Sequence, residues 1–184
     1  MTAVGYGRAT VTVTAGSVSA ECAVSVEPDI RLNILGASIR IANPYGIRVG
    51  VQLTKNEAYK TTEVIEYGTV MKPAEILAGE ELTVDTPSSL VIPAKTVLSE
   101  NDAQIVYTGV LIDIPDSFRP TVVTARGYLK YRGADGAEYT IYTPQIDRSF
   151  TGVAQAAYDD YSSLYDISTA QLAALNALEE ILGK

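Results

Sequence analysis

The first part of the chain alternates between apolar and polar side chains over two consecutive runs. Val11 and Val13 lie between threonines, and every even-numbered residue of the range Val18–Val26 is apolar. A period of two over runs separated by Ala15-Gly16-Ser17 predicts a β-hairpin. Pro28 ends the second run, since proline cannot donate to a ladder. A lone hairpin is marginal in water, so we expect this one to pack onto the main sheet or to be exchanged with another copy of the chain.

The following segment carries most of the strand patterns. Val, Ile, Tyr and Thr dominate its two longest runs, as a half-buried pleated surface prefers. Asn43-Pro44-Tyr45-Gly46 predicts a type I turn, and Asp135-Gly136 predicts a hairpin connection. Residues 73–79 suit one or two helical turns, and residues 80–103 suit a long loop with short strand fragments. Strands are predicted over 37–42, 47–53, 63–71, 104–114, 121–131 and 138–143.

Two amphipathic helices end the chain. The first has its apolar stripe at positions that recur with helical spacing from Phe150 to Tyr161. The second begins at a capping box formed by Ser168 and Gln171. The apolar positions of this second helix are Leu172, Leu175, Leu178, Ile181 and Leu182. We therefore predict a mainly β protein. It has a hairpin at 1–27, an antiparallel β-sandwich-like domain at 28–146, and two C-terminal α-helices at 147–184 packed on that domain.

Composition excludes several classes of function and says less about the fold. The net charge of −8 disfavours nucleic acid, because phosphate binding relies on clustered Lys and Arg. No apolar run reaches the roughly 18 residues of a membrane span, so we expect no membrane insertion. The sequence has no histidine, which excludes histidine-based acid–base chemistry and the commonest zinc ligand. Its single cysteine, Cys22, excludes an intrachain disulfide. We predict no catalytic residue, no metal and no cofactor.

Acidic residues offer two candidate constellations, and each has a simpler explanation. Glu63 and Glu66 could serve a glycosidase as acid and nucleophile, but their odd spacing predicts opposite faces of a strand. Asp159, Asp160 and Asp166 could supply oxygen ligands to calcium, but they lack the spacing of a calcium-binding loop. A solvated helix face and a helix-end loop explain this second group, and a recognition loop between the helices is an alternative that the sequence leaves open. The chain is therefore predicted not to be an enzyme.

Tyrosine is the one unusual component of the sequence. The chain has 12 tyrosines, two phenylalanines and no tryptophan. Several tyrosines fall on the hairpin around Asp135-Gly136, where Tyr128 alternates in phase with Arg126. An aromatic face stacks on the apolar face of a sugar ring, so the candidate ligand-binding residues are Arg126, Tyr128, Tyr139 and Tyr142. The alternative is that these rings pack in a half-buried sheet and keep their hydroxyls in water.

The hairpin also carries a family resemblance. The string GRATVTVTAGSVSAECAVSVEP resembles the last two strands of the bacterial immunoglobulin-like repeat of group 2. The matching residues are Gly7, Ala9, Thr10, Gly16, Ser19, Ala20, Cys22, Val24 and Val26. The resemblance covers residues 5–27 and lacks the earlier strands. It implies that residues 1–27 are part of such a repeat, in a chain cut from a longer tandem surface protein.

The central segment resembles an uncharacterised module of secreted clostridial proteins, some of them associated with cellulosomes. The matching pieces are GASIRIANPYGIRV at 36–49, EYGTVMKPAEIL at 66–77, TARGYLKY at 124–131 and DRSFTGVA at 147–154. This resemblance carries over no catalytic residue. It implies an extracellular or cell-surface location in a multi-domain protein.

Together these observations predict a non-catalytic extracellular module with a structural or adhesive role. Its expected partners are a cell-surface protein, the cell wall or a polysaccharide. A homodimer through the N-terminal hairpin is a further prediction. The alternative function is a carbohydrate-binding module that stacks tyrosines on sugars.

Overall fold

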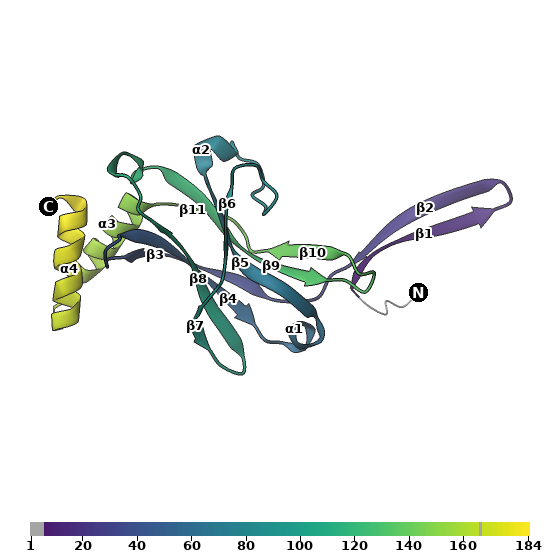
Figure 1. The fold of residues 1–184 in the computed structure, drawn as a ribbon, viewed down its shortest axis with the longest axis horizontal. Coiled ribbons are helices and arrows are strands. Elements are labelled where there is room, and N and C mark those ends of the chain that lie inside the picture. Colours follow the sequence, from purple (N-terminus) through teal and green to yellow (C-terminus); the bar gives the residue numbers. More distant parts are fainter. Residues whose placement is uncertain (1–5, 166) are drawn as a thin grey trace.

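The computed structural model describes residues 6–165 and 167–184. Its body consists of two antiparallel sheets packed face to face, with a hairpin at one end and two helices at the other (Figure 1). This confirms the predicted class, a mainly β antiparallel sandwich with two C-terminal helices.

Each sheet of the sandwich joins strands that are distant in the sequence. The first sheet has the order β3 (Leu32–Arg40), β4 (Gly46–Thr54), β8 (Gln104–Ile112) and β7 (Val97–Glu100). The second has the order β10 (Glu138–Tyr142), β9 (Val122–Arg132), β5 (Glu63–Pro73) and β6 (Leu90–Pro93). A further strand, β11 (Ile146–Ser149), pairs with the beginning of β9.

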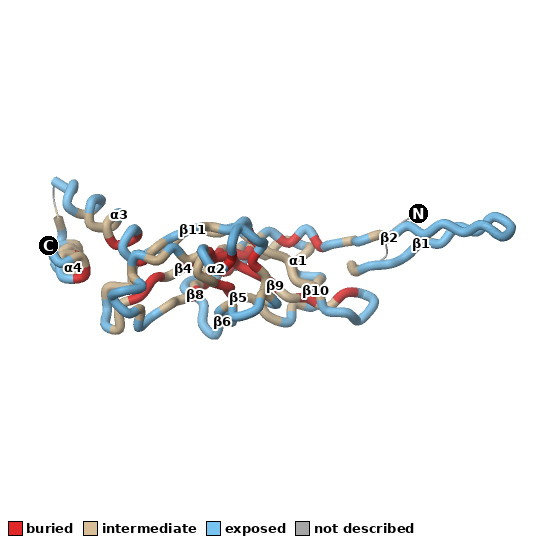
Figure 2. Tube along the Cα trace, turned by 90° about the horizontal axis from the view of Figure 1, so that it is seen from above, coloured by how far each residue is buried: buried red, intermediate tan, exposed pale blue. Residues whose placement is uncertain are grey.

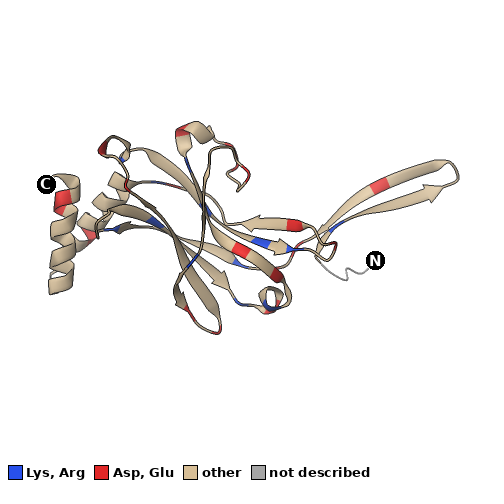
Figure 3. Ribbon diagram, in the orientation of Figure 1, with Lys and Arg blue, Asp and Glu red and all other residues tan. Residues whose placement is uncertain are grey.

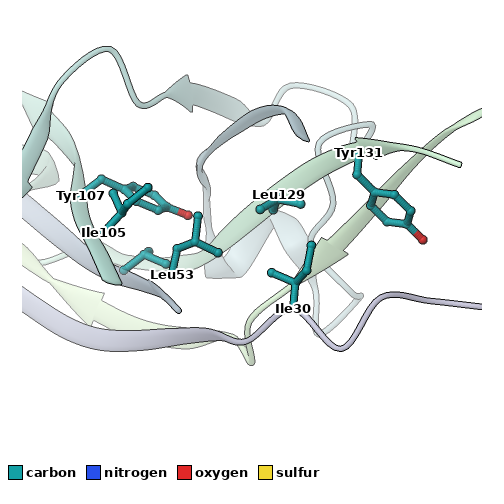
Figure 4. Packing of buried hydrophobic residues seen from close by; sticks show 7 residues of the cluster. Ile30, Leu53, Ile105, Tyr107, Leu129 and Tyr131 are labelled. Carbon is teal, nitrogen blue, oxygen red and sulfur yellow. The ribbon is translucent and has the colours of Figure 1, made fainter. Parts of the chain in front are cut away.

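The core lies between the two sheets. Leu53, Ile105 and Tyr107 of the first sheet pack against Leu129 and Tyr131 of the second (Figure 4). The buried Tyr107 hydroxyl lies 3.2 Å from the carbonyl oxygen of Gly68 and 3.3 Å from that of Tyr128 on the opposite sheet. A buried hydroxyl needs such a partner, because an unmade hydrogen bond in the core is costly.

Two glycines let the sheets approach closely. A Cβ added to Gly109 of β8 would fall on the hydroxyl of Thr69 in β5. A Cβ added to Gly127 of β9 would lie 2.8 Å from the methyl groups of Val51 in β4. Thr69 and Val51 are themselves fully buried. Each of these two side chains therefore fills the space that a glycine of the opposite sheet leaves.

The N-terminal hairpin projects away from the body. Its strands β1 (Gly7–Ala15) and β2 (Val18–Val26) pair without a register shift. No residue of either strand is buried, and Figure 2 shows the hairpin as almost entirely exposed. The expectation that it packs onto the chain's own main sheet is therefore wrong. Exchange with another copy stays a prediction.

The hairpin is fixed at its base rather than along its length. Ala134 N–H donates to the carbonyl oxygen of Tyr6 at 2.6 Å. Arg8 N–H donates to the hydroxyl of Tyr139 at 3.2 Å, and the Arg8 guanidinium lies 5.6 Å from the centroid of that ring. These contacts join the first residues of β1 to the β9–β10 turn, and the rest of the ribbon extends beyond them (Figure 1).

The C-terminal helices close the opposite end. Helix α3 (Phe150–Ser162) buries Phe150, Val153 and Ala154 against Ile47 of β4. Helix α4 (Thr169–Leu182) packs on α3, and the predicted Ser168–Gln171 capping box is present. One predicted member of the apolar face of α4 differs, because Leu172 is 47% exposed and Ala174 is buried instead. Leu172 lies in the first turn of α4.

Several short elements differ from the sequence predictions. The peptide bond Asn43–Pro44 is cis. Residues 42–44 form a bend, and no hydrogen-bonded turn is assigned where the type I turn was predicted. Prolyl amides have only a small trans preference, which lets their surroundings select either isomer. Two helices were not predicted, α1 (Glu57–Thr61) and the 3-10 helix η1 (Asp116–Phe118), and neither was β11. Helix α2 (Ala74–Leu77) and the short strands β6 and β7 lie where the sequence suggests them.

Candidate binding surface

The four candidate ligand-binding residues do not share one face. Tyr142 of β10 pairs with Tyr128 of β9, and Arg126 lies two residues before Tyr128, so these three side chains are on the outer face of the second sheet. Tyr139 pairs with Tyr131, whose side chain lies in the core, so Tyr139 is on the inner face. The structure thus brings together three of the four residues.

Arg126 is a clamp between the sheet and the segment that follows α2. Its Nε donates to the carbonyl oxygen of Thr143 at 2.9 Å. Its Nη1 donates to the Leu82 carbonyl oxygen at 2.9 Å and to Glu81 Oε1 at 2.8 Å. The guanidinium lies 4.4 Å from the centroid of the Tyr142 ring, within cation–π distance. The guanidinium of Arg126 thus makes its hydrogen bonds and its ring contact within the chain.

Tyr128 is fully buried beneath this arrangement. Its hydroxyl donates to Glu66 Oε1 at 2.7 Å. Burial, followed by this hydrogen bond to Glu66, raises the pKa of the Tyr128 phenol. A ring without exposed surface offers no face for a sugar to stack on, so Tyr128 has the packing role that the sequence left open.

Tyr142 and Tyr139 are half-buried, and the hydroxyl of each is bonded within the chain. The Tyr142 hydroxyl accepts from Val84 N–H at 3.1 Å. The Tyr139 hydroxyl donates to Asp135, and this bond is the main cause that lowers the pKa of the Asp135 carboxyl and raises the pKa of the Tyr139 phenol. The Tyr139 ring lies 5.7 Å from that of Tyr131. Tyr142 retains the partial exposure that a stacking residue requires.

The predicted placement of Glu63 and Glu66 on opposite faces is wrong. A register shift between Val64 and Glu66 makes Glu63 pair with Arg132 and Glu66 with Lys130. Arg132 and Lys130 are two residues apart on β9, so both glutamates lie on the outer face. Glu63 Oε1 is 3.0 Å from Arg132 Nε, and Glu66 accepts from Tyr128. The bulge inserts one residue between Glu63 and Glu66 that has no partner on β9. The two glutamates, three residues apart in sequence, therefore pair with residues two apart and point to the same face.

The other acidic candidates do not form a cluster in the part of the chain that is described. Asp159 accepts from Gln155 Nε2 at 2.6 Å on the exposed side of α3. Asp166 lies outside the described residues. Among residues 6–165 and 167–184, no group of three or more His, Cys, Asp or Glu side chains is arranged to hold a metal ion.

Among the described residues, one face of the β1–β2 hairpin is apolar and no buried residue covers it. Cross-strand pairing places Gly7, Ala9, Val11, Val13, Ala15, Val18, Ala20, Cys22, Val24 and Val26 on this face. Val13 is 65% exposed and Val18 is 70% exposed. The charged residues of the two strands are Arg8 and Glu21, and the pairing register places both on the opposite face. Figure 3 shows that charged positions are few along the hairpin. We call the ten-residue surface the apolar face of the hairpin.

The sandwich also has an apolar cavity at the end away from the hairpin. Its volume is about 260 Å³, and it opens between β5, β8 and the segment 113–121. Met71, Leu111 and Phe150 line its floor, and Leu90, Ile112 and Phe118 lie at its exposed rim. The sequence patterns did not predict this cavity. A signal for it exists, since Phe118 is a single large apolar residue between Pro115 and Pro120, outside any strand pattern.

Comparison with known proteins finds no matching family model, no matching curated protein and no matching solved structure. No helix in the described part of the chain is both long enough and apolar enough to cross a membrane.

Proposed function

We propose that this chain is a non-catalytic module of an extracellular, multi-domain bacterial surface protein, in which it has a structural and adhesive role. The observation that carries the proposal is the exposed apolar face of the β1–β2 hairpin. Contiguous exposed apolar surfaces mark sites of association with another protein. The hairpin is held at its base by Asp135 and Tyr139, so it presents this face at a defined position.

The edges of the sheets support the same role. In the sandwich, β3 and β7 carry register shifts, β6 ends in Pro93, and β10 and β11 have 5 and 4 residues. Bulges, proline and short length all prevent a sheet edge from pairing with another chain. Each hairpin strand has 9 residues and no bulge. The sandwich edges are therefore protected, whereas the hairpin edges remain open to a strand from a partner.

The resemblance of residues 5–27 to an immunoglobulin-like repeat supports a place in a surface protein. The acidic balance of the chain, with a net charge of −8, fits a solubilised surface module. The carbohydrate-binding alternative has less support. Of its four residues, Tyr128 is fully buried, Arg126 is engaged in the clamp, and Tyr139 faces the core.

The test is retention of the protein on bacterial cell-envelope material and on a panel of immobilised polysaccharides. We expect the wild type to be retained on envelope material that contains surface protein. Val13→Asp, which places a charge on the apolar face, is expected to abolish retention. Thr14→Asp is the matched control, because Thr14 is the neighbour of Val13 on the polar face and pairs with the uncharged Ser19. Equal retention of the wild type and Val13→Asp would contradict the proposal.

The polysaccharide panel separates the alternative function. Tyr142→Ala is the informative variant, because Tyr142 keeps partial exposure. Retention on a glycan that is lost in Tyr142→Ala but kept in Val13→Asp would favour the carbohydrate-binding module. Incubation of the wild type with the same glycans is expected to release no reducing ends. Release of reducing ends would contradict the non-catalytic proposal.

A further inference from the structure

The apolar cavity lies where β7 is too short to cover its neighbour β8. Strand β7 pairs with residues 105–107 of β8, whereas β8 itself continues to Ile112. Beyond Tyr107, β8 has β4 on one side and, in the described chain, no strand on the other. Leu111 and Ile112 belong to this uncovered part and line the cavity. We call residues 108–112 the open edge of β8.

The backbone direction along the open edge follows from the hydrogen bonds at the other end of the strand. Lys55 N–H donates to the carbonyl oxygen of Ala103 at 2.8 Å, one position beyond the β4–β8 ladder. Gln104, the next residue, accepts from Asn101 N–H on the β7 side. Hydrogen-bonded and non-hydrogen-bonded pairs alternate along an antiparallel ladder, and this ladder has no register shift. The even-numbered residues of the open edge therefore direct their N–H and C=O groups away from β4, toward the uncovered side.

A strand added to this edge would place one side chain in the cavity. Directly opposite residues of an antiparallel pair have their side chains on the same face of the sheet. Leu111 faces the second sheet, where it packs against the cluster that contains Met71, so a residue opposite Leu111 would point into the cavity. The residues before and after it would lie opposite Val110 and Ile112 and would form hydrogen bonds with their backbone groups.

The cavity has room for a large apolar side chain. Its volume is about 260 Å³, whereas an apolar cavity of about 150 Å³ holds benzene. Leu90, Ile112 and Phe118 are exposed around its mouth. A small molecule enclosed in the cavity would leave these rim side chains in water, whereas a peptide strand on the open edge would cover them. The apolar rim and the outward-facing backbone groups together favour a peptide over a small molecule.

Charge and backbone conformation at the mouth agree with an apolar occupant. Lys72 and Asp113 are the charged residues of the lining. Lys72 Nζ donates to the carbonyl oxygen of Pro87 at 2.8 Å and Asp113 is exposed, so an apolar side chain would bury no unpaired charge. Ser88 and Asp113 have positive φ angles of 60° and 56°. Residues other than glycine rarely adopt this conformation, and strained residues of this kind cluster at binding sites.

We propose that the open edge of β8 binds an extended peptide of another chain in antiparallel orientation, with a large apolar side chain of that peptide in the cavity. In this mode of recognition, backbone hydrogen bonds give affinity and a pocket gives specificity. Every residue of the site lies between 47 and 150, in the interior of the chain. The inference goes beyond the proposed function, because the cavity and the hairpin lie at opposite ends of the sandwich and are tested separately.

The probes are the N-acetylated, C-amidated peptide Thr-Thr-Phe-Thr-Thr and its counterpart with leucine in the centre. Each is titrated into the full chain, and amide chemical shifts are followed by NMR. We expect saturable shifts at Val110 and Ile112 at millimolar peptide, because their N–H groups exchange water for peptide carbonyl oxygens. Alanine in the centre should weaken binding by about tenfold or more, since the cavity then stays unfilled. Absence of saturable shifts with both probes would overturn the proposal.

Backbone methylation of the peptide tests the strand pairing itself. Methylation of the nitrogens of the two threonines adjacent to phenylalanine removes the N–H groups that would donate to Val110 and Ile112. We expect binding to weaken by about tenfold or more. Methylation of the phenylalanine nitrogen is the matched control, because that N–H would point away from β8, and affinity should change by less than about twofold. Equal affinities of the two methylated peptides would overturn strand addition.

Two protein variants test the rim of the cavity. Phe118→Asp should weaken binding of the phenylalanine peptide by about fivefold or more, because it places a charge at the apolar mouth. Leu98→Asp is the control and should bind as the wild type does, since Leu98 lies on β7 outside the cavity lining. Both positions are exposed, so both variants are expected to fold. Equal affinities of the two variants would contradict the cavity as the binding pocket.

The ligand class and the proposed function are tested apart. Toluene that shifts the Met71 methyl signal, in a protein that binds neither peptide, would identify a small-molecule site and overturn the peptide. Val13→Asp should bind the phenylalanine peptide with wild-type affinity, because Val13 lies in the hairpin. Failure of envelope retention would therefore overturn the adhesive role and leave the peptide site, and failure of peptide binding would do the reverse.

Discussion

Two hairpins of this molecule have the same kind of sequence and different surroundings. In β9–β10 the inward positions, which include Leu129, Tyr131 and Ile141, are covered by the first sheet. In β1–β2 the corresponding apolar positions contact no second layer, and no residue of either strand is buried. An alternating pattern therefore identifies an apolar face, but the rest of the chain determines whether that face is covered.

The surroundings explain this difference. Strand β9 pairs with β5 on one side and with β10 and β11 on the other, and the first sheet lies across its inner face. Strand β1 pairs with β2 alone. A two-stranded ribbon without a second layer gains little from its apolar residues in water. Each prediction below tests this difference between the sandwich and the hairpin, from the largest expected effect to the smallest.

Removal of a core side chain is expected to have the largest effect. Leu129→Ala in β9 should lower the free energy of unfolding by about 2–5 kcal/mol, because it creates a cavity in the main cluster. Val13→Ala in β1 should change it by no more than about 0.5 kcal/mol, because Val13 is exposed. Urea unfolding at a low protein concentration measures both values. A cost for Val13→Ala equal to that of Leu129→Ala would show that the hairpin belongs to the folding unit of the sandwich.

The close approach of the two sheets is tested by adding one methyl group. Gly109→Ala should lower the free energy of unfolding by about 1–3 kcal/mol, because the new Cβ falls on the buried Thr69 hydroxyl. The matched control is Gly50→Ala on β4, where the nearest atom is Leu35 Cβ at 3.4 Å. Thermal unfolding of both variants measures the difference. If Gly50→Ala is as destabilising as Gly109→Ala, the effect does not come from contact between the sheets.

The Arg126 clamp is expected to have an effect of similar or smaller size. Arg126→Met should lower the free energy of unfolding by about 1–3 kcal/mol, because the carbonyl oxygens of Leu82 and Thr143 lose their donor. Limited proteolysis should then cleave the segment 78–89 faster. Arg132→Met is the control, since its pairs with Glu63 and Glu138 are exposed and screened by solvent, so its loss should change stability little. Unchanged proteolysis in Arg126→Met would contradict the role of the clamp.

The smallest expected effect is that of pH on the free energy of unfolding. Near neutral pH we expect almost no change, and at alkaline pH we expect stability to fall. Burial raises the pKa of the Tyr107 phenol above its ordinary value of 10.0. The folded state therefore keeps a proton that the unfolded state loses above that value, and stability falls as the pH rises further. Tyr107→Phe should make this decline shallower than in the wild type. Urea unfolding between neutral and alkaline pH measures the slopes, and identical slopes would contradict the assignment.

The sequence predicted the strands well where one face is buried. The predicted strand 121–131 corresponds to β9, where Ala125, Gly127, Leu129 and Tyr131 lie on the inward face. The bulge at Val64–Glu66 was not visible in the sequence, because an inserted residue reverses the phase of the alternation without an obvious marker. The helix α1 and the strand β11 escaped prediction because both are short, and a short run shows too little of its period.

The candidate ligand-binding residues show a second limit of prediction from sequence. Tyrosine content identified residues that share a sheet, but not the segment that covers them. Tyr128 is buried because Arg126 holds the segment after α2 over the outer face, a contact between residues 44 positions apart. The apolar face of the hairpin was predicted as a pattern, whereas its exposure depends on the absence of a covering layer in the described chain. The alternation of apolar and polar residues does not tell whether another part of the chain covers the apolar face.

The connections at the two ends of the sandwich have a mechanical consequence. The hairpin continues through residues 27–31 into β3 of the first sheet, and α3 follows directly on β11 of the second sheet. The hairpin and the C-terminal helices lie at opposite ends of the long axis (Figure 1). A tensile load between them enters one sheet, leaves through the other, and must cross the interface between the layers. The module then resists extension in shear, with Gly109 against Thr69 and Gly127 against Val51 acting as interlocks that prevent one sheet from sliding past the other.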